Sequence, residues 1–102
     1  MAMYDSLLIP ATLRGTRVQV NAATSSAEIL LGANTKFWYC SDQDTHLRFG
    51  LTGLGDADAT DMYVPAKTPI MLDFGLDLTA FKVYNASAAS TANVHYIRMS
   101  QF

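Results

Sequence analysis

The chain has 102 residues, half of them apolar and only 16% charged, and its formal net charge at pH 7 is −2. These values predict one folded domain over residues 1–102 and exclude a disordered chain, which would be polar and rich in charge. They also argue against a nucleic-acid partner, because a phosphate backbone attracts a basic surface rather than an acidic one.

The first third of the chain carries weak strand signals. The apolar run Leu7–Ile9 stops at Pro10, so Ser6–Leu13 is predicted to form an interrupted strand, unless residues 1–13 form an N-terminal arm. No basic segment precedes this run, which therefore lacks the pattern of a signal peptide. No segment approaches the ~20 apolar residues that cross a bilayer, so no membrane partner is expected. Arg17–Val20 alternates polar and apolar side chains, as a half-buried strand does.

The centre of the chain predicts a hairpin followed by a loop. Lys36–Cys40 is an aromatic run, and Thr45–Phe49 alternates apolar with polar residues. The turn formers Ser41–Asp44 lie between them, so the two runs are predicted to pair as a β-hairpin. Glycines and aspartates make Gly50–Asp61 a predicted loop.

Further strand signals lie at Glu28–Leu31, Tyr63–Val64, Ile70–Phe74, Ala80–Tyr84 and Val94–Met99. No stretch repeats apolar residues at the helical spacing of i, i+3, i+4 and i+7. Short strands at near-regular intervals predict an all-β fold: a single antiparallel β-sandwich or jelly-roll-like barrel of about seven or eight strands.

Two of these predicted strands are apolar on both faces. Val94 and Tyr96 take one face of the last strand, Ile97 and Met99 take the other, and the run Phe37–Cys40 is likewise apolar on both sides. A lone antiparallel sandwich needs only one apolar face per sheet. The second face is therefore predicted to be covered by a neighbouring subunit, which we favour, or by the N-terminal segment. Low charge and many aromatic and Met residues agree with self-association.

The signals between Thr35 and Met99 come in a distinctive order. An aromatic-rich strand and a polar turn lead to a strand that ends in Arg48–Gly50, and a long loop and the stretch Val64–Pro69 follow. A small-residue turn then separates the last two strands. This order resembles the small β-sandwich proteins of tailed bacteriophages that serve as head decoration, or cement, proteins.

The resemblance implies a jelly-roll-like homo-oligomer, most often a trimer, that binds the major capsid protein or another virion protein. Such proteins stabilise the shell by binding across the joints between coat subunits, which requires surface area rather than catalysis. The implied location is the virion, after synthesis and folding in the host cytoplasm, and a single cysteine agrees with a reducing compartment. A tail or head–tail connector subunit is the alternative within the structural class.

The candidate interface residues combine aromatic or apolar positions with arginines, whose planar guanidinium suits paired contacts to carboxylates. The alternative is that the arginines serve only solubility. The candidates are Tyr4, Leu8, Arg14, Arg17, Trp38, Arg48, Tyr96 and Arg98.

A carbohydrate-binding module is the rival interpretation from another functional class. Trp38 and Tyr39 are adjacent in a predicted strand, so they point to opposite faces. One of them is then a core residue, and the other is free to pack on a partner or to stack on a sugar ring.

The acidic loop offers a weak cation signal. Asp56, Asp58 and Asp61 could supply oxygen ligands to a hard cation, but the loop lacks the Gly and Glu of the EF-hand template. A solvated loop is therefore expected, and no metal or other cofactor is predicted.

No catalytic site is predicted either. Cys40 and His46 flank the predicted hairpin turn, yet no third group orients them and no oxyanion-hole loop accompanies them. We expect Cys40 to be a small buried hydrophobe and both His46 and His95 to lie at the surface or at an interface. The protein is predicted not to be an enzyme.

Overall fold

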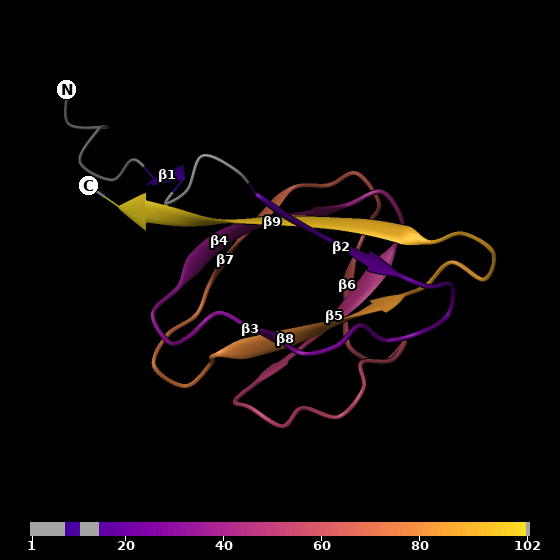
Figure 1. Cartoon of the computed structure of the whole chain (residues 1–102), viewed down its shortest axis with the longest axis horizontal. Coiled ribbons are helices and arrows are strands. Elements are labelled where there is room, and N and C mark those ends of the chain that lie inside the picture. Colours follow the sequence, from indigo (N-terminus) through magenta and orange to yellow (C-terminus); the bar gives the residue numbers. More distant parts are fainter. Residues whose placement is uncertain (1–7, 11–14, 102) are drawn as a thin grey trace.

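The computed structural model describes residues 8–10 and 15–101, and it confirms the all-β prediction. Two antiparallel sheets pack against each other (Figure 1). Within the described residues there are nine strands and no helix. The strands are β1 (Leu8–Pro10), β2 (Thr16–Val20), β3 (Ile29–Leu30), β4 (Lys36–Ser41), β5 (Thr45–Gly50), β6 (Met62–Val64), β7 (Ile70–Asp73), β8 (Ala80–Asn85) and β9 (Ala92–Gln101).

The strand order is that of a jelly roll. Sheet A contains β2, β9, β4 and β7 in that order, and sheet B contains β3, β8, β5 and β6. The pairs β2–β9, β3–β8, β4–β7 and β5–β6 fold the first half of the chain back along the second, which is the nested order of a double-sheet jelly roll. The short strand β1 shares the outer edge of β9 with β2, so each sheet is four strands wide. The predicted jelly-roll-like sandwich is confirmed.

The hairpin predicted around Ser41–Asp44 is wrong. β4 belongs to sheet A and β5 to sheet B, so this connection carries the chain across the sandwich. Alternation cannot separate the two arrangements, because each strand buries one face in either of them. In the jelly roll, Phe37 and Tyr39 enter the core from one sheet and Thr45 and Leu47 enter it from the other. The hydroxyls of Tyr39 and Thr45 form a hydrogen bond inside the core, and burial raises the pKa of Tyr39 to about 12.

Phe81 lies at the centre of an aromatic core. Its ring stacks on Phe37 with centroids 5.2 Å apart and planes 21° apart. It meets Tyr39, Phe74 and Tyr96 edge-on at 6.4, 6.4 and 5.9 Å. Phe81 comes from sheet B, whereas Phe37, Tyr39 and Tyr96 come from sheet A. These ring contacts therefore join the two layers, in geometries that aromatic pairs prefer.

The buried side-chain amide of Asn85 forms hydrogen bonds with backbone groups at one end of this core. The Nδ2 of Asn85 donates to the carbonyls of Val20 at 3.0 Å and Ser90 at 2.7 Å, and its Oδ1 accepts from the N–H of Ser87 at 2.9 Å. In the part of the chain that the structure describes, no buried side-chain nitrogen or oxygen lacks a hydrogen-bond partner. The buried polar side chains of the described residues are therefore satisfied within the chain, as is usual in native interiors.

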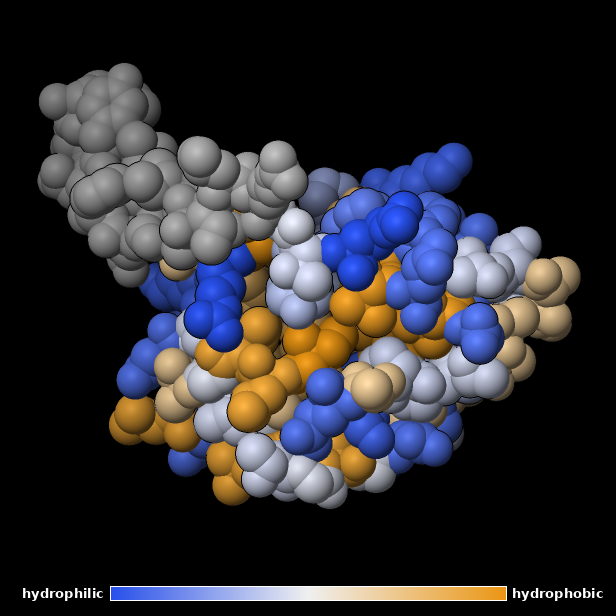
Figure 2. Space-filling model, in the orientation of Figure 1, coloured by the Kyte–Doolittle hydropathy of each residue, from blue (hydrophilic) through white to orange (hydrophobic). Residues whose placement is uncertain are grey.

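One edge of the sandwich is bridged by an arginine. The Nη2 of Arg98, on β9, donates to the carbonyl of Leu31, just after β3, at 3.0 Å. Figure 2 shows apolar surface between β9 and β8 in this view. The guanidinium thus ties β9 of sheet A to the segment that follows β3 of sheet B.

The connection between β4 and β5 is held to β9 by a carboxylate. Asp42 accepts from the side-chain amide of Asn93 at 2.8 Å and from its backbone N–H at 2.7 Å. These two hydrogen bonds lower the pKa of Asp42 below its usual value of 3.8, because they favour the ionised form.

We expect Phe81→Ala to reduce the free energy of unfolding by about 3–5 kcal/mol, because it removes the ring that both sheets contact and leaves a cavity. Urea unfolding followed by circular dichroism measures the loss. Leu76→Ala, at a side chain that is 76% exposed, is the matched control and should change stability little. An equal loss in both variants would contradict the central role of Phe81.

We expect Asp42→Asn to be less stable than the parent chain at pH 7 and to approach it in acid. The folded-state pKa of Asp42 is lowered, so its contribution is complete above its unfolded pKa near 3.8 and is lost as the pH falls through the folded value. Thermal melting at pH 7, 4, 3 and 2 measures the difference between the two chains. Asp77→Asn, in the β7–β8 connection, is the control. A difference that persists at pH 2 would contradict the assignment.

Candidate functional site

The outer face of sheet A carries an apolar hollow. Trp38 of β4 lies opposite Ile97 of β9, and Cys40 lies opposite His95. These side chains alternate with the buried residues of their strands and so point away from the core. They line a hollow of about 280 Å³ whose rim is completed by Gly15 and Pro69.

The apolar surface extends across three strands. Met71 of β7 lies opposite Trp38 on the side away from β9. Trp38 is 38% exposed, and Met71 and Ile97 are half-buried. Charged groups stand at the margin: Lys36 pairs with Asp73 at 3.8 Å. An apolar centre with a polar rim is the composition of a protein interface.

The predicted two-faced strands are therefore confirmed. Phe37, Tyr39 and Val94 are fully buried on the inner face of sheet A, whereas Trp38 and Ile97 lie on its outer face. The cover of that outer face stays a prediction, because most of the N-terminal segment, residues 1–7 and 11–13, lies outside the described residues. Residues 8–10 form β1 at the edge of the same sheet.

The outer face of sheet B is partly covered by the chain itself. The loop from Leu51 to Asp61 folds over β5 and β8, and Ala57 within it is 3% exposed. The N–H of Ala57 donates to Ser25 Oγ at 3.0 Å, and the N–H of Leu54 donates to Glu28 at 2.8 Å. These bonds fix the loop to the segment that precedes β3.

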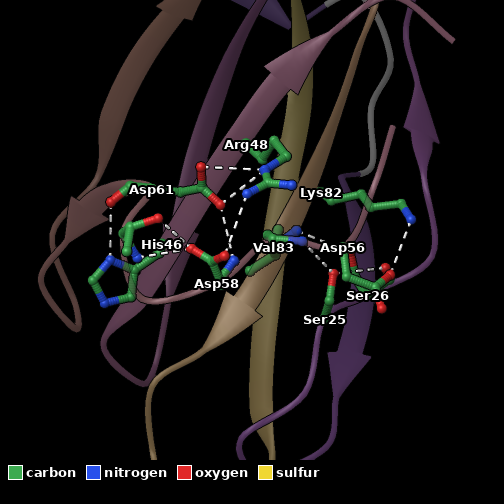
Figure 3. A network of polar contacts seen from close by, with 11 residues as sticks. Ser25, Ser26, His46, Arg48, Asp56, Asp58, Asp61, Lys82 and Val83 are labelled. Carbon is green, nitrogen blue, oxygen red and sulfur yellow. Dashed lines mark hydrogen bonds and ion pairs between the residues drawn. The ribbon is translucent and has the colours of Figure 1, made fainter. Parts of the chain in front are cut away.

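The aspartates of this loop bind cationic side chains of the sheet. Arg48 Nε lies 3.0 Å from the carboxylate of Asp61, and Arg48 Nη2 lies 3.4 Å from that of Asp58. Lys82 Nζ lies 3.2 Å from Asp56. Figure 3 shows the carboxylates directed at these two cations. The loop is largely exposed, as expected, and is also ion-paired to the sheet. The described residues include no cluster of three or more side chains that could hold a metal ion.

The thiol and imidazole groups do not meet as the sequence suggested. Cys40 lies on the outer face of sheet A and His46 on that of sheet B, so the two are separated by the core. Cys40 lies opposite His95 instead. It is half-buried in the hollow, so the prediction of a buried core cysteine is wrong. The crossing between β4 and β5 separates Cys40 from His46, and Cys40 faces outward because it alternates with the buried Tyr39 and Ser41 along β4.

The structure places the candidate interface residues that it describes in different parts of the fold, so they do not form one surface. Tyr4 and Arg14 lie outside the described residues, and Leu8 lies in β1. Arg17, on β2, lies opposite His95, which lines the hollow beside Trp38. The others serve the fold: Arg48 binds the acidic loop, Tyr96 packs on Phe81 and Arg98 bridges the sheet edges.

Sequence reasoning missed part of the hollow. His95 and Ile97 line it beside Trp38, and Met71 extends the apolar face on the other side of Trp38. The alternation of residues 70–74 and 94–99 separated Met71 from Ile70 and Ile97 from Val94 without indicating which face is buried, and only the sheet order makes β7 and β9 the neighbours of β4. Of the two residues considered for stacking on a sugar ring, Tyr39 is fully buried and Trp38 is exposed. The carbohydrate interpretation of this pair therefore depends on Trp38 alone.

Comparisons with known proteins found no matching family model, curated protein or solved structure. The described part of the chain contains no helix with the length and hydrophobicity of a bilayer-spanning segment.

We expect Arg48→Ala to loosen the acidic loop while leaving the sandwich folded. The amide protons of Leu54, Ala57 and Asp58, which are hydrogen-bonded in the closed loop, should exchange at least tenfold faster. Global stability should fall by about 1 kcal/mol or less, since exposed ion pairs contribute little. Hydrogen exchange by NMR measures both. Lys36→Ala, on sheet A, should leave these amides unchanged. Unaltered exchange in Arg48→Ala would show that the backbone bonds alone hold the loop.

Proposed function

We propose that this chain is a non-enzymatic structural subunit of a phage particle, most specifically a capsid decoration (cement) protein. The observation that carries the proposal is the apolar outer face of sheet A around Trp38. The inner faces of both sheets already form a complete core, so this outer face has no role in closing the described sandwich. A contiguous exposed apolar patch with a polar rim marks an interaction surface.

The fold and the composition support a structural role. Jelly rolls serve as viral capsid and lectin domains, and the order of sequence signals resembles head decoration proteins. Only 16% of the residues are charged, which suits a subunit that buries much of its surface.

The mechanism follows from surface burial. The indole of Trp38 stands beside a hollow, and a large aromatic side chain next to a pocket is the usual anchor of a protein interface. Burial of this face against a second copy or against the major capsid protein removes apolar surface from water. A subunit that does so across a joint between coat subunits opposes their separation. A homotrimer at a local threefold axis is the favoured arrangement, and a ring-forming tail or connector subunit is the alternative.

The first test is native mass in solution, by size exclusion with light scattering across a dilution series. We expect an oligomer near three times the 11.1 kDa of one chain, and we expect Trp38→Ser to shift it to smaller species. Tyr63→Ser, a 53% exposed tyrosine on sheet B, is the matched control and should assemble normally. Circular dichroism shows whether each variant is folded.

The second test is co-sedimentation with expanded capsids of the phage that encodes the chain. The parent chain should bind and raise the temperature at which the shells disrupt, and Trp38→Ser should bind at least tenfold more weakly. A parent chain that stays monomeric and does not bind the shell would overturn the proposal. A ring with more than three subunits would favour the connector role.

A further inference from the structure

The outer face of sheet B presents a row of three rings on three adjacent strands. His46 of β5 lies opposite Tyr63 of β6 and opposite Tyr84 of β8. The ring centroids of His46 and Tyr63 are 5.4 Å apart, and those of His46 and Tyr84 are 6.1 Å apart. Strands lie about 4.8 Å apart in a sheet, so the row spans roughly 10 Å, enough for two pyranose rings.

The acidic loop leaves this row accessible. Its aspartates are bound to Arg48 and Lys82, the residues next to His46 and Tyr84 on the same face of β5 and β8. Tyr63 is 53% exposed, and His46 and Tyr84 are half-buried. The loop therefore covers one part of the sheet and borders the row of rings.

The central ring of the row, that of His46, is held in place before any ligand binds. The Nδ1 of His46 is hydrogen-bonded to the carbonyl of Asp61 at 3.1 Å (Figure 3). Tyr84 also bridges to Ser25 through the backbone. Rings that are already ordered lose little conformational entropy on binding.

The charged groups around the row are acceptors rather than free cations. Desolvation and the Asp44 carboxylate beside it raise the pKa of Tyr63. The carboxylate of Asp58 accepts hydrogen bonds from the N–H and hydroxyl of Thr60 and is paired with Arg48. Lys82, the other cation of this face, is paired with Asp56. An anionic ligand would meet carboxylates here, whereas a ligand rich in hydroxyl donors would find acceptors.

We infer that the row Tyr63–His46–Tyr84 is a binding site for a neutral saccharide. The apolar C–H face of a pyranose ring packs on aromatic rings, and the sugar hydroxyls donate to the carboxylates of Asp44 and Asp58. Nucleic acids and sulfated or uronic polysaccharides are disfavoured by the same carboxylates. This site lies on the opposite side of the sandwich from Trp38, so it stands or fails independently of the proposed assembly role.

The test is a titration of the full chain with four neutral hexasaccharides, followed by backbone NMR. The probes are cellohexaose, maltohexaose, chitohexaose and mannohexaose, and a hyaluronan hexasaccharide is the anionic comparator. We expect saturable binding of at least one neutral probe, with shifts centred on β5, β6 and β8. Tyr63→Ala and Tyr84→Ala should each weaken binding at least tenfold, with melting temperatures close to that of the parent chain.

Trp38→Ala is the matched control, because it removes an exposed aromatic ring from the opposite face. It should bind the saccharide normally. The inference is overturned if none of the four neutral probes binds at 10 mM, if hyaluronan binds more tightly, or if binding survives both tyrosine substitutions. Loss of binding in Trp38→Ala instead would move the site to sheet A. Tyr63→Ala should still assemble, which separates this result from the assembly test.

Discussion

The stack of Phe81 on Phe37 is the contact on which the rest of the sandwich depends. Sheet B reaches sheet A through this pair at 5.2 Å and through the edge-on contacts of Phe81 with Tyr39 and Tyr96. A chain of this length has room for only one such core. The inner-face side chains Val20, Leu47, Val64, Val83 and Val94 pack around these rings, and the alternate residues of the strands face outward. The outer faces do not take part in this core, so their side chains are available for other contacts.

The two outer faces differ in how their side chains are covered. On sheet B, the chain covers Arg48 and Lys82 with its own acidic loop, so charges that would be solvated are paired locally. On sheet A, the described residues leave Trp38 partly exposed beside an apolar hollow. This asymmetry suits a subunit that attaches through sheet A. Sheet B would then face outward, where the row of aromatic rings is available to a soluble saccharide.

Much of the fold could be predicted from alternation and from short apolar runs. The positions of β5 and β7 follow from periods of two, and those of β4, β8 and β9 follow from short apolar or aromatic runs; the two faces of Phe37–Cys40 follow because side chains alternate strictly along a strand. The absence of helical spacing excluded other fold classes. The pairing of the strands could not be predicted in this way. A turn such as Ser41–Asp44 is compatible with a hairpin and with a crossing between sheets, since both bury the same side chains.

The sequence by itself determined that the chain is all-β, which residues alternate and that the surface carries little charge. Only the tertiary structure decided which residues meet. It separated Cys40 from His46, brought Asp58 and Asp61 to Arg48, and placed Met71 and Ile97 on either side of Trp38. The physical reason is that jelly-roll pairing joins strands distant in sequence, and local periodicity carries no information about such partners. Sites built across strands therefore emerge only when the sheet order is known.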